Sequence, residues 1–410
     1  MNIILHMAWR NIWRNKRRTW LSVAGIGFST FLFVFVMPLQ FGAYDLMIDA
    51  SLRMFTGYAQ IQKANYQQQP LIHNAIEGVS EIAQKIRNAN EFEAVAVRAS
   101  GFALMSSRER SYGAQVIGVQ PGHEPKVSII PANVKQGRFL SSDDAQEIFI
   151  GASLARNLKV KVGDEVTVLG SGKDGSLAAT ILPVVGIFET GSEEMDRYIA
   201  EIPLHTFQGL FSMGDSAHNI SVIGKSVQDI DVIPQQLSKF IREDEDLVVL
   251  NWGELMPGIK EGLQMDKASG LIFMLVLVIV VVFSILNTFL MVVLERTKEF
   301  GLMLALGDKP FNISKLMMLE SLLMTALGLV IGTAVAVALN LYFLEEGFRY
   351  PGMKELMEAY NMPLDVMYPK FDAFTILFGP IVVFLSTNLA AWLPLRHIHR
   401  LQPVDAMRTV

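Results

Sequence analysis

The sequence contains no cysteine among its 410 residues, which excludes a disulfide scaffold, a thiol nucleophile and a thiolate metal site. Charged residues make up only 18% of the chain and hydrophobic residues 51%, which is the opposite of the balance in a disordered chain. The formal net charge of −5 gives no support to nucleic-acid binding. An ordinary soluble core does not need this excess of apolar side chains, so the composition indicates a membrane protein.

The apolar residues are concentrated in four long segments that are almost free of charge. These are residues 19–42, 268–294, 316–344 and 373–395, and the single charged residue among them is Glu320. At 1.5 Å per residue each segment can cross a hydrocarbon core of roughly 30 Å. The basic residues before the first segment also fit a secretory signal peptide, but such peptides have a shorter apolar region. We therefore predict four transmembrane helices.

Basic residues near the predicted helices set their orientation, because cytoplasmic loops carry an excess of lysine and arginine. Segment 1–18 has five basic and no acidic residues, and segment 396–410 has three arginines and one aspartate. Both ends are therefore predicted to be cytoplasmic, as is the basic segment 295–315. Segment 43–267 has 20 basic and 29 acidic residues, and segment 345–372 has three and six, which places both outside the cytoplasm.

The large outer segment, 43–267, is predicted to fold as an α/β domain. Apolar residues at helical spacing predict helices at 77–88, 153–158, 227–240 and 254–267. Alternating or continuous apolar runs predict strands at 94–99, 114–119, 147–150, 166–169, 180–187 and 198–202. The fold class is thus a four-helix membrane protein with a large extracytoplasmic α/β domain.

One glycine-rich stretch, GSGKDG at residues 170–175, formally matches G-x-G-x-x-G. A phosphate-binding loop requires a hydroxyl residue after the lysine and then a helix. Asp174 follows Lys173 instead, and the next residues are strand-like, so we predict a hairpin turn. The sequence also lacks Ser-His-Asp or metal-ligand spacing, and we predict no catalytic, cofactor-binding or metal-binding residues in this chain.

Segment 294–309 (LERTKEFGLMLALGDK) begins with charges at the end of the second predicted span and continues as a short amphipathic helix. Its apolar positions are Phe300, Met303, Leu304 and Leu306, and Gly307 stands where the end of a helix favours glycine. An ordinary interfacial helix would have this pattern. A lever that docks into a groove of a cytoplasmic partner, with ion pairs at its rim, would have it as well.

The stretch ERTKEFGLMLALG closely resembles the E-R-x-x-E-I-G-x-x-R-A-L-G signature of the FtsX-type permeases, which include the MacB exporters and the lipoprotein-releasing (Lol) permeases. Other segments resemble the same family in matching order. These are the basic start of the first span (8–26), the third span (312–332), the closing segment (393–408), and two parts of the periplasmic core domain (137–170 and 184–204).

This resemblance implies a transmembrane subunit of a type VII ABC transporter in the bacterial inner membrane, working as a dimer with two copies of a separate cytoplasmic ATPase. ATP and magnesium would bind to the ATPase. Closure of the ATPases would move the helix at 295–307, and the first two spans would transmit this motion to the outer domain. The implied coupling residues are Glu295, Arg296, Lys298, Glu299, Phe300, Gly301, Leu304, Leu306 and Gly307.

Two residues near this helix leave questions open. Within the signature, an apolar residue of this helix stands where the family has arginine, which removes one ion pair with the ATPase. Glu320 has two interpretations. Its side chain extends to the membrane interface, or it pairs with a cation of the coupling helix.

Three cargo hypotheses follow from the resemblance: extraction of lipoproteins from the outer leaflet, export through a periplasmic adaptor, and signalling to a cell-wall hydrolase. A lipid-anchored cargo needs an apolar surface, because moving an acyl chain into water costs about 0.8 kcal/mol per CH₂. Plain lipid contact and helix packing would also explain the aromatic residues of the first two spans. The candidate cleft residues are Phe31, Phe35, Met37, Pro38, Phe41, Phe273 and Phe283.

Overall fold

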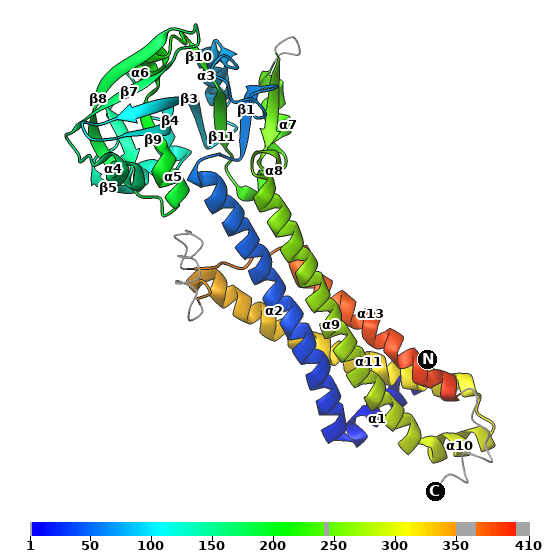
Figure 1. Ribbon diagram of the computed structural model, residues 1–410. Coiled ribbons are helices and arrows are strands. Elements are labelled where there is room, and N and C mark those ends of the chain that lie inside the picture. Colours follow the sequence, from blue (N-terminus) through cyan, green and yellow to red (C-terminus); the bar gives the residue numbers. More distant parts are fainter. Residues whose placement is uncertain (1, 242–245, 350–365, 399–410) are drawn as a thin grey trace. The chain divides into compact units, whose positions relative to one another are not determined.

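The computed structural model describes residues 2–241, 246–349 and 366–398, and the chain divides into two compact units (Figure 1). A helical unit comprises residues 1–44, 262–351 and 365–410, and an α/β unit comprises residues 45–261 and 352–364. The helices Lys16–Met54 and Pro257–Glu295 are longer than the predicted spans 19–42 and 268–294, and each of them has residues in both units.

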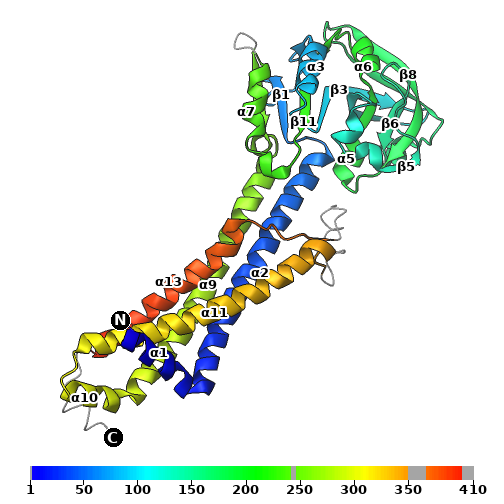
Figure 2. The same cartoon turned by 180° about the vertical axis from the view of Figure 1, so that it is seen from behind.

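Within the described residues, the helical unit contains the helices α1 (Asn2–Arg14), α2 (Lys16–Met54), α9 (Pro257–Glu295), α10 (Thr297–Ala305), α11 (Pro310–Glu346) and α13 (Ala373–Ile398), which Figure 2 shows from behind. Among the described residues, four of these helices, α2, α9, α11 and α13, are long and apolar enough by length and composition to cross a membrane. They contain the four segments that the sequence predicted as spans.

Helices α2 and α11 pack closely because glycines face each other at the contact. A Cβ atom on Gly332 would lie 2.3 Å from the backbone oxygen of Gly27, and one on Gly328 would lie 2.7 Å from Ile26. Further along, the Asn340 side chain donates a hydrogen bond of 2.8 Å to the Val34 carbonyl. Small residues and interhelical hydrogen bonds are typical of helix association in a bilayer.

Helix α9 differs from the other long helices in its exposure. Only 6% of its most apolar 18-residue window is buried, against 39% for α2. Its large apolar side chains therefore form a surface that lipid or another chain can cover.

The α/β unit contains a ten-stranded mixed sheet in the order β12-β1-β11-β3-β4-β9-β6-β8-β5, with β7 paired to β3 and β8. Its strands are β1 (Ala59–Lys63), β3 (Ala94–Ser106), β4 (Ser111–Val119), β5 (Val134–Gly137), β6 (Ile148–Gly151), β7 (Glu165–Ser171), β8 (Leu177–Phe188), β9 (Ile199–Pro203), β11 (Asn219–Ile223) and β12 (Leu247–Asn251). A second sheet pairs β2 (Ile76–Glu77) with β10 (Ser216–Ala217). The short helices are α3 (Val79–Asn88), α4 (Ala152–Leu158), α5 (Glu193–Tyr198), α6 (Leu204–Leu210), α7 (Ile233–Leu237) and α8 (Trp252–Leu255).

Residues 170–175 lie at the turn between β7 and β8, which pair as an antiparallel hairpin, with Ser171 opposite Leu177. The hairpin prediction for this glycine-rich stretch is therefore confirmed. In contrast, the prediction of a single helix at 227–240 is wrong. Two short 3₁₀ turns, at Val227–Asp229 and Ser238–Phe240, flank α7 there. Pro234 lies in the first turn of α7 and lacks the N–H that a longer helix would need at that position.

The C-terminal turn of α2 is capped by groups of the α/β unit. The Ile129 N–H donates to the Arg53 carbonyl at 2.9 Å, and the Ser128 hydroxyl donates to the Met54 carbonyl at 3.0 Å. Arg98, which is buried, donates to the Phe55 carbonyl and forms an ion pair with buried Glu124. These contacts satisfy carbonyls that the helix end leaves without intrahelical partners.

Candidate functional site: an ion-pair network around α10

Helix α10 is separated from α9 by a break at Arg296, whose backbone leaves the helical conformation. Within α10, Phe300 and Gly301 are buried, whereas Leu302 and, beyond its end, Leu306 are exposed. The helix ends at Ala305, and the chain turns away at Gly307, where φ is 95°, a left-handed conformation that glycine adopts without strain. Pro310 then occupies the first turn of α11, where its missing N–H costs nothing.

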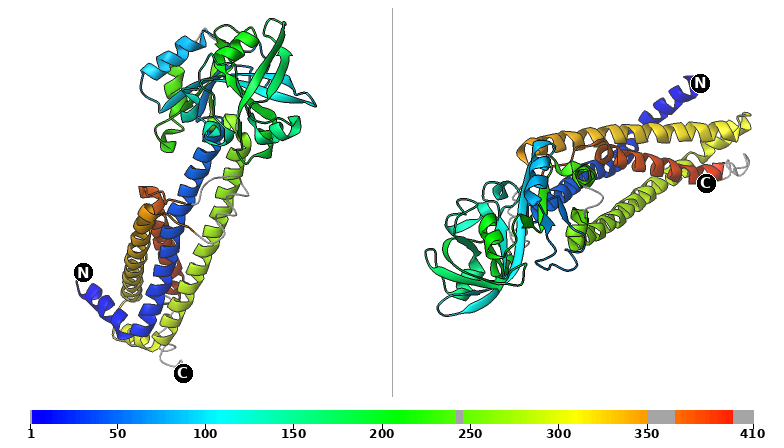
Figure 3. Two further views of the ribbon diagram at one scale, coloured as in Figure 1. Left: turned by 90° about the vertical axis from the view of Figure 1, so that its left-hand side faces the viewer. Right: turned by 90° about the horizontal axis from the view of Figure 1, so that it is seen from above.

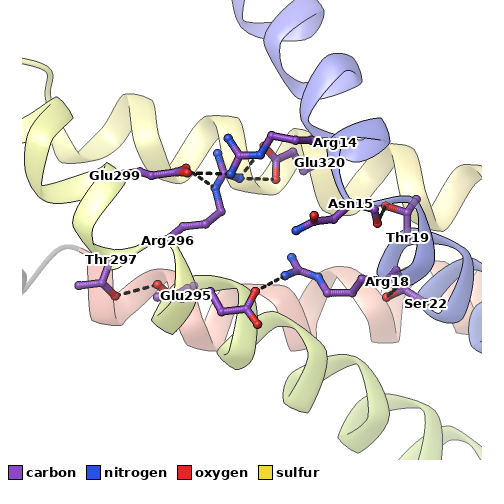
Figure 4. A network of polar contacts seen from close by, with 11 residues as sticks. Arg14, Asn15, Arg18, Thr19, Ser22, Glu295, Arg296, Thr297, Glu299 and Glu320 are labelled. Carbon is purple, nitrogen blue, oxygen red and sulfur yellow. Dashed lines mark hydrogen bonds and ion pairs between the residues drawn. The ribbon is translucent and has the colours of Figure 1, made fainter. Parts of the chain in front are cut away.

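Arg296 is the centre of the network (Figure 4). Its Nη1 atom lies 3.1 Å from both carboxylate oxygens of Glu320, and its Nε lies 2.9 Å from Glu299. The guanidinium also lies 5.3 Å from the centroid of the Phe300 ring, within the range of a cation–π contact. The Asn11 side chain donates to Glu320 at 2.7 Å. Glu320 thus joins α1, α11 and the α9–α10 junction.

Two further ion pairs connect the N-terminal helices to the same region (Figure 4). Arg14 lies 2.7 Å from Glu299, and Arg18 lies 2.8 Å from Glu295. Their side chains are partly exposed, so each pair by itself contributes little stability. Together with the Arg296 pairs, however, they fix the position of α10 relative to α1, α2 and α11.

The charges in this network support one another. Burial lowers the pKa of Arg296, but Glu320 and Glu299 favour its charged form more strongly, so the pKa is raised. Burial raises the pKa of Glu299, but hydrogen bonds from Arg296 and Arg14 outweigh this effect and hold the pKa below its ordinary value. Arg296 and Glu299 therefore hold each other in their charged forms.

The structure places the predicted coupling residues on two different sides. Phe300, Gly301 and Arg296 face the helical unit, and Leu304 packs partly against its core. The exposed positions are Glu295, Lys298, Glu299, Leu306 and Gly307, together with Leu302, which the sequence analysis did not select.

Sequence reasoning also missed Asn11, Arg14 and Arg18. Arg14 and Arg18 are four residues apart, as are Glu295 and Glu299, but this spacing does not by itself assign the partners. The two basic residues face the two acidic ones in the structure, each with its own partner. For Glu320, the structure shows pairing with a cation of the α10 region.

The candidate cleft residues do not gather in one place. Phe31 and Phe35 stack at 5.4 Å between ring centroids, and Phe35 contacts Phe343 of α11 at 6.1 Å. Phe273 and Phe283 are exposed on α9. Pro38 lies inside α2, and its carbonyl accepts a hydrogen bond of 2.9 Å from the Lys370 N–H.

Met37 and Phe41, in contrast, line a cavity of about 230 Å³ with residues of α9 and α13. Leu271, Met274, Phe374 and Phe378 form most of the remaining apolar wall. At the rim, the Tyr44 hydroxyl donates to Asp266 at 2.5 Å, and the Lys267 ammonium lies 5.7 Å from the Tyr44 ring centroid. The cavity thus combines an apolar interior with polar and charged groups beside it.

Comparison with known proteins gives two family matches. The family described as FtsX-like permease C-terminal matches residues 271–403, and the MacB-like periplasmic core domain matches residues 19–240. The second match covers more than half of the chain.

Among curated relatives, the lipoprotein-releasing system transmembrane protein LolC of Xylella fastidiosa is 24% identical over 73% of this chain and 74% of its own length. The corresponding LolE of Haemophilus influenzae is 21% identical over 99% of both chains. The macrolide export ATP-binding/permease protein MacB of Bdellovibrio bacteriovorus is 23% identical over 82% of this chain and 54% of its own. Among solved structures, the periplasmic region of MacB from Actinobacillus actinomycetemcomitans gives a TM-score of 0.36 at 16% identity, over 49% of this chain and 92% of that one.

Proposed function

Since this chain belongs to the FtsX-like permeases that carry a MacB-like periplasmic core domain, we propose that it extracts a lipid-anchored cargo, such as a lipoprotein, from the outer leaflet of a bacterial inner membrane. It is an ABC transporter permease of the Lol, MacB and FtsX type. In this proposal a separate cytoplasmic ATPase binds ATP and magnesium, and two copies of it act on a dimer of permease subunits.

The observation that carries the coupling part of this proposal is the ion-pair network around Arg296. A lever must be attached firmly to the helices that it moves. Arg296 and Glu320 provide a mostly buried attachment, and the pairs of Arg14 and Arg18 add two more at the surface. Movement of α10 would therefore displace α1, α2 and α11 together, while Leu302 and Leu306 remain exposed for contact with the ATPase.

The lipidic cargo is supported by the cavity at Met37 and Phe41. Along α2, Phe41 follows Arg18 by about 35 Å at 1.5 Å per residue, so the cavity and the network occupy opposite ends of the membrane segment. With α10 on the cytoplasmic side, as the positive-inside rule predicts, the cavity would lie at the level of the outer leaflet. An acyl chain would contact the apolar wall, and its polar attachment would remain beside Tyr44 and Lys267.

A second candidate function is export of a small molecule or peptide through a periplasmic adaptor. The relative that favours it is the MacB of Bdellovibrio bacteriovorus, which matches 82% of this chain. The two functions differ in what the cavity holds before ATP is added.

Mass spectrometry of the full chain with its ATPase in nanodiscs tests the proposal. A triacylated protein should co-purify without nucleotide and leave on addition of ATP, while a non-hydrolysable analogue serves as the control. Co-purification of an adaptor without any acylated protein would favour export instead.

A further inference from the structure

Helix α1 has apolar residues on two different faces. Ala8 and Ile12 are buried at 0% and 3% exposure, and α1 packs against α11. Leu5, Met7 and Trp9 are between 43% and 47% exposed on the remaining surface. Figure 3 shows α1 diverging from the start of α2. A large part of each of these three apolar side chains is therefore left open for contact with lipid or another molecule.

The basic residues that follow separate into two sets. Arg14 and Arg18 pair with the carboxylates of Glu299 and Glu295. Arg10, Lys16 and Arg17 are exposed, and within the described part of the chain none of these three has a carboxylate partner. Three cations thus lie on the same short segment as the exposed apolar surface.

Three tryptophans of this segment lie close to one another. The Trp9 and Trp13 rings lie 5.9 Å apart and the Trp13 and Trp20 rings 6.4 Å apart, all edge to face. Trp9 also lines a cavity of about 350 Å³ together with Leu5, His6 and Leu323. Tryptophan is enriched where hydrocarbon meets headgroups, because its ring is apolar and its N–H is polar.

We propose that this segment is a binding site for an anionic phospholipid, in the leaflet at the α1 end of the helical unit. Arg10, Lys16 and Arg17 bind the phosphate and other anionic groups of the head, and the cavity beside Leu5, Trp9 and Leu323 holds the upper part of an acyl chain. Because Arg14 and Arg18 extend from the same segment to α10, the lipid also helps to position the ion-pair network.

The combination of groups favours a lipid over an acidic protein surface. A purely acidic protein surface would pair with the cations and leave Leu5, Met7 and Trp9 without apolar contacts. A phospholipid accounts for both features, since amphipathic helices with basic and aromatic residues bind at the interface of anionic membranes.

Tryptophan quenching by brominated phospholipids tests this site directly. The full chain, with Trp252→Phe and Trp392→Phe, retains only Trp9, Trp13 and Trp20 as tryptophans. It is reconstituted in phosphatidylcholine nanodiscs containing equal mole fractions of either brominated phosphatidylglycerol or brominated phosphatidylcholine. We expect the anionic lipid to quench more strongly, and high salt to reduce this excess because it screens exposed charges.

The triple substitution R10Q/K16Q/R17Q should remove the excess quenching. Each basic residue near an anionic surface contributes about fivefold in lipid affinity, so the apparent affinity should fall by more than about tenfold. Quenching by brominated phosphatidylcholine should not change, which verifies that the segment still lies at the bilayer. The matched control, K126Q/K161Q/K239Q, removes three exposed lysines of the α/β unit and should leave the excess intact.

Three results would overturn the proposal. Equal quenching by the two brominated lipids would show no preference for an anionic head, and an excess that survives the triple substitution would exclude these cations. Loss of the excess at millimolar inorganic phosphate would assign the site to a soluble anion. Neither ATPase nor cargo is needed for the measurement, so its outcome is independent of the proposed transport function.

Discussion

Arg296 and Glu320 form an ion pair across 24 residues, with side chains only 12% and 8% exposed. Arg296 lies at the break between α9 and α10, and Glu320 lies inside the long helix that follows α10. A charge in such an environment is stable only with its partner. This pair therefore links the junction of α9 and α10 directly to α11.

Removing one partner of this pair should be strongly destabilising. We expect Arg296→Met to lower the stability of the full chain by about 3–5 kcal/mol, because Glu320 is left mostly buried and uncompensated. The double variant R296M/E320L should recover most of this loss and still fail to couple ATP hydrolysis to cargo release. Thermal unfolding in nanodiscs and a release assay measure the two effects. Equal stability of the single and double variants would contradict the importance of the pairing.

The exposed pair of Arg14 and Glu299 should behave differently. Arg14→Gln is expected to change stability by less than about 1 kcal/mol, since the pair is solvent-exposed. Arg14→Glu places like charges together and should reduce coupled release more than Arg14→Gln does. Measurements at low and high salt provide the control, because screening weakens exposed pairs.

Leu306 should be an anchor for the ATPase. Its side chain is 80% exposed, so Leu306→Asp should leave thermal stability unchanged and weaken ATPase association by at least about tenfold. Leu177→Asp is a matched control, because Leu177 is 79% exposed in the α/β unit. Gly301→Arg is a poorer probe, since Gly301 is buried and an arginine there would disturb packing. If Leu306→Asp binds the ATPase as tightly as the unchanged protein does, the docking surface does not lie on α10.

Stability of the α/β unit should depend on pH through His218. Burial lowers the pKa of His218 to about 4. The Ser100 N–H donates to its Nδ1 at 2.9 Å, which fixes the neutral tautomer with Nε2–H facing the Ile72 carbonyl. The unfolded state therefore binds a proton that the folded state does not, below a pH of about 6.5.

Stability is thus expected to fall as the pH decreases from 6.5 toward 4, by about 2 kcal/mol at pH 5. Urea unfolding of the full chain, followed by the emission of Trp252 with the other four tryptophans replaced by phenylalanine, measures this change. In His218→Gln the contribution of this site should disappear. The same pH slope in both proteins would assign the dependence to other groups.

Arg98 should be essential for the end of α2. Arg98→Met leaves Glu124 buried without a partner and the Phe55 carbonyl uncapped, and we expect a loss of about 3–5 kcal/mol. Lys159→Met is the control, because its pair with Glu109 is exposed and should contribute little to stability. Urea unfolding of the two variants, again read from Trp252, would show no difference if the Arg98 contacts were unimportant.

From local sequence patterns alone we could predict the four long apolar helices, the α/β character of the large segment, the hairpin at residues 170–175 and the segment that forms α10. These features depend on local patterns: uncharged apolar runs, alternation, turn residues and a contiguous signature. The family assignment was likewise available from contiguous motifs, and the comparisons confirmed it.

Only the tertiary structure decided which residues meet. The partner of Glu320 is 24 residues away, and those of Arg14 and Arg18 are more than 270 residues away, so no local pattern could select them. The same holds for the aromatic residues of α2: their spacing gave a single apolar set, but packing divided it between α11 and the cavity with α9 and α13. Burial also turned Phe300 inward and left Leu302 exposed, because the neighbouring helices, and not the periodicity of α10, determine which face is covered.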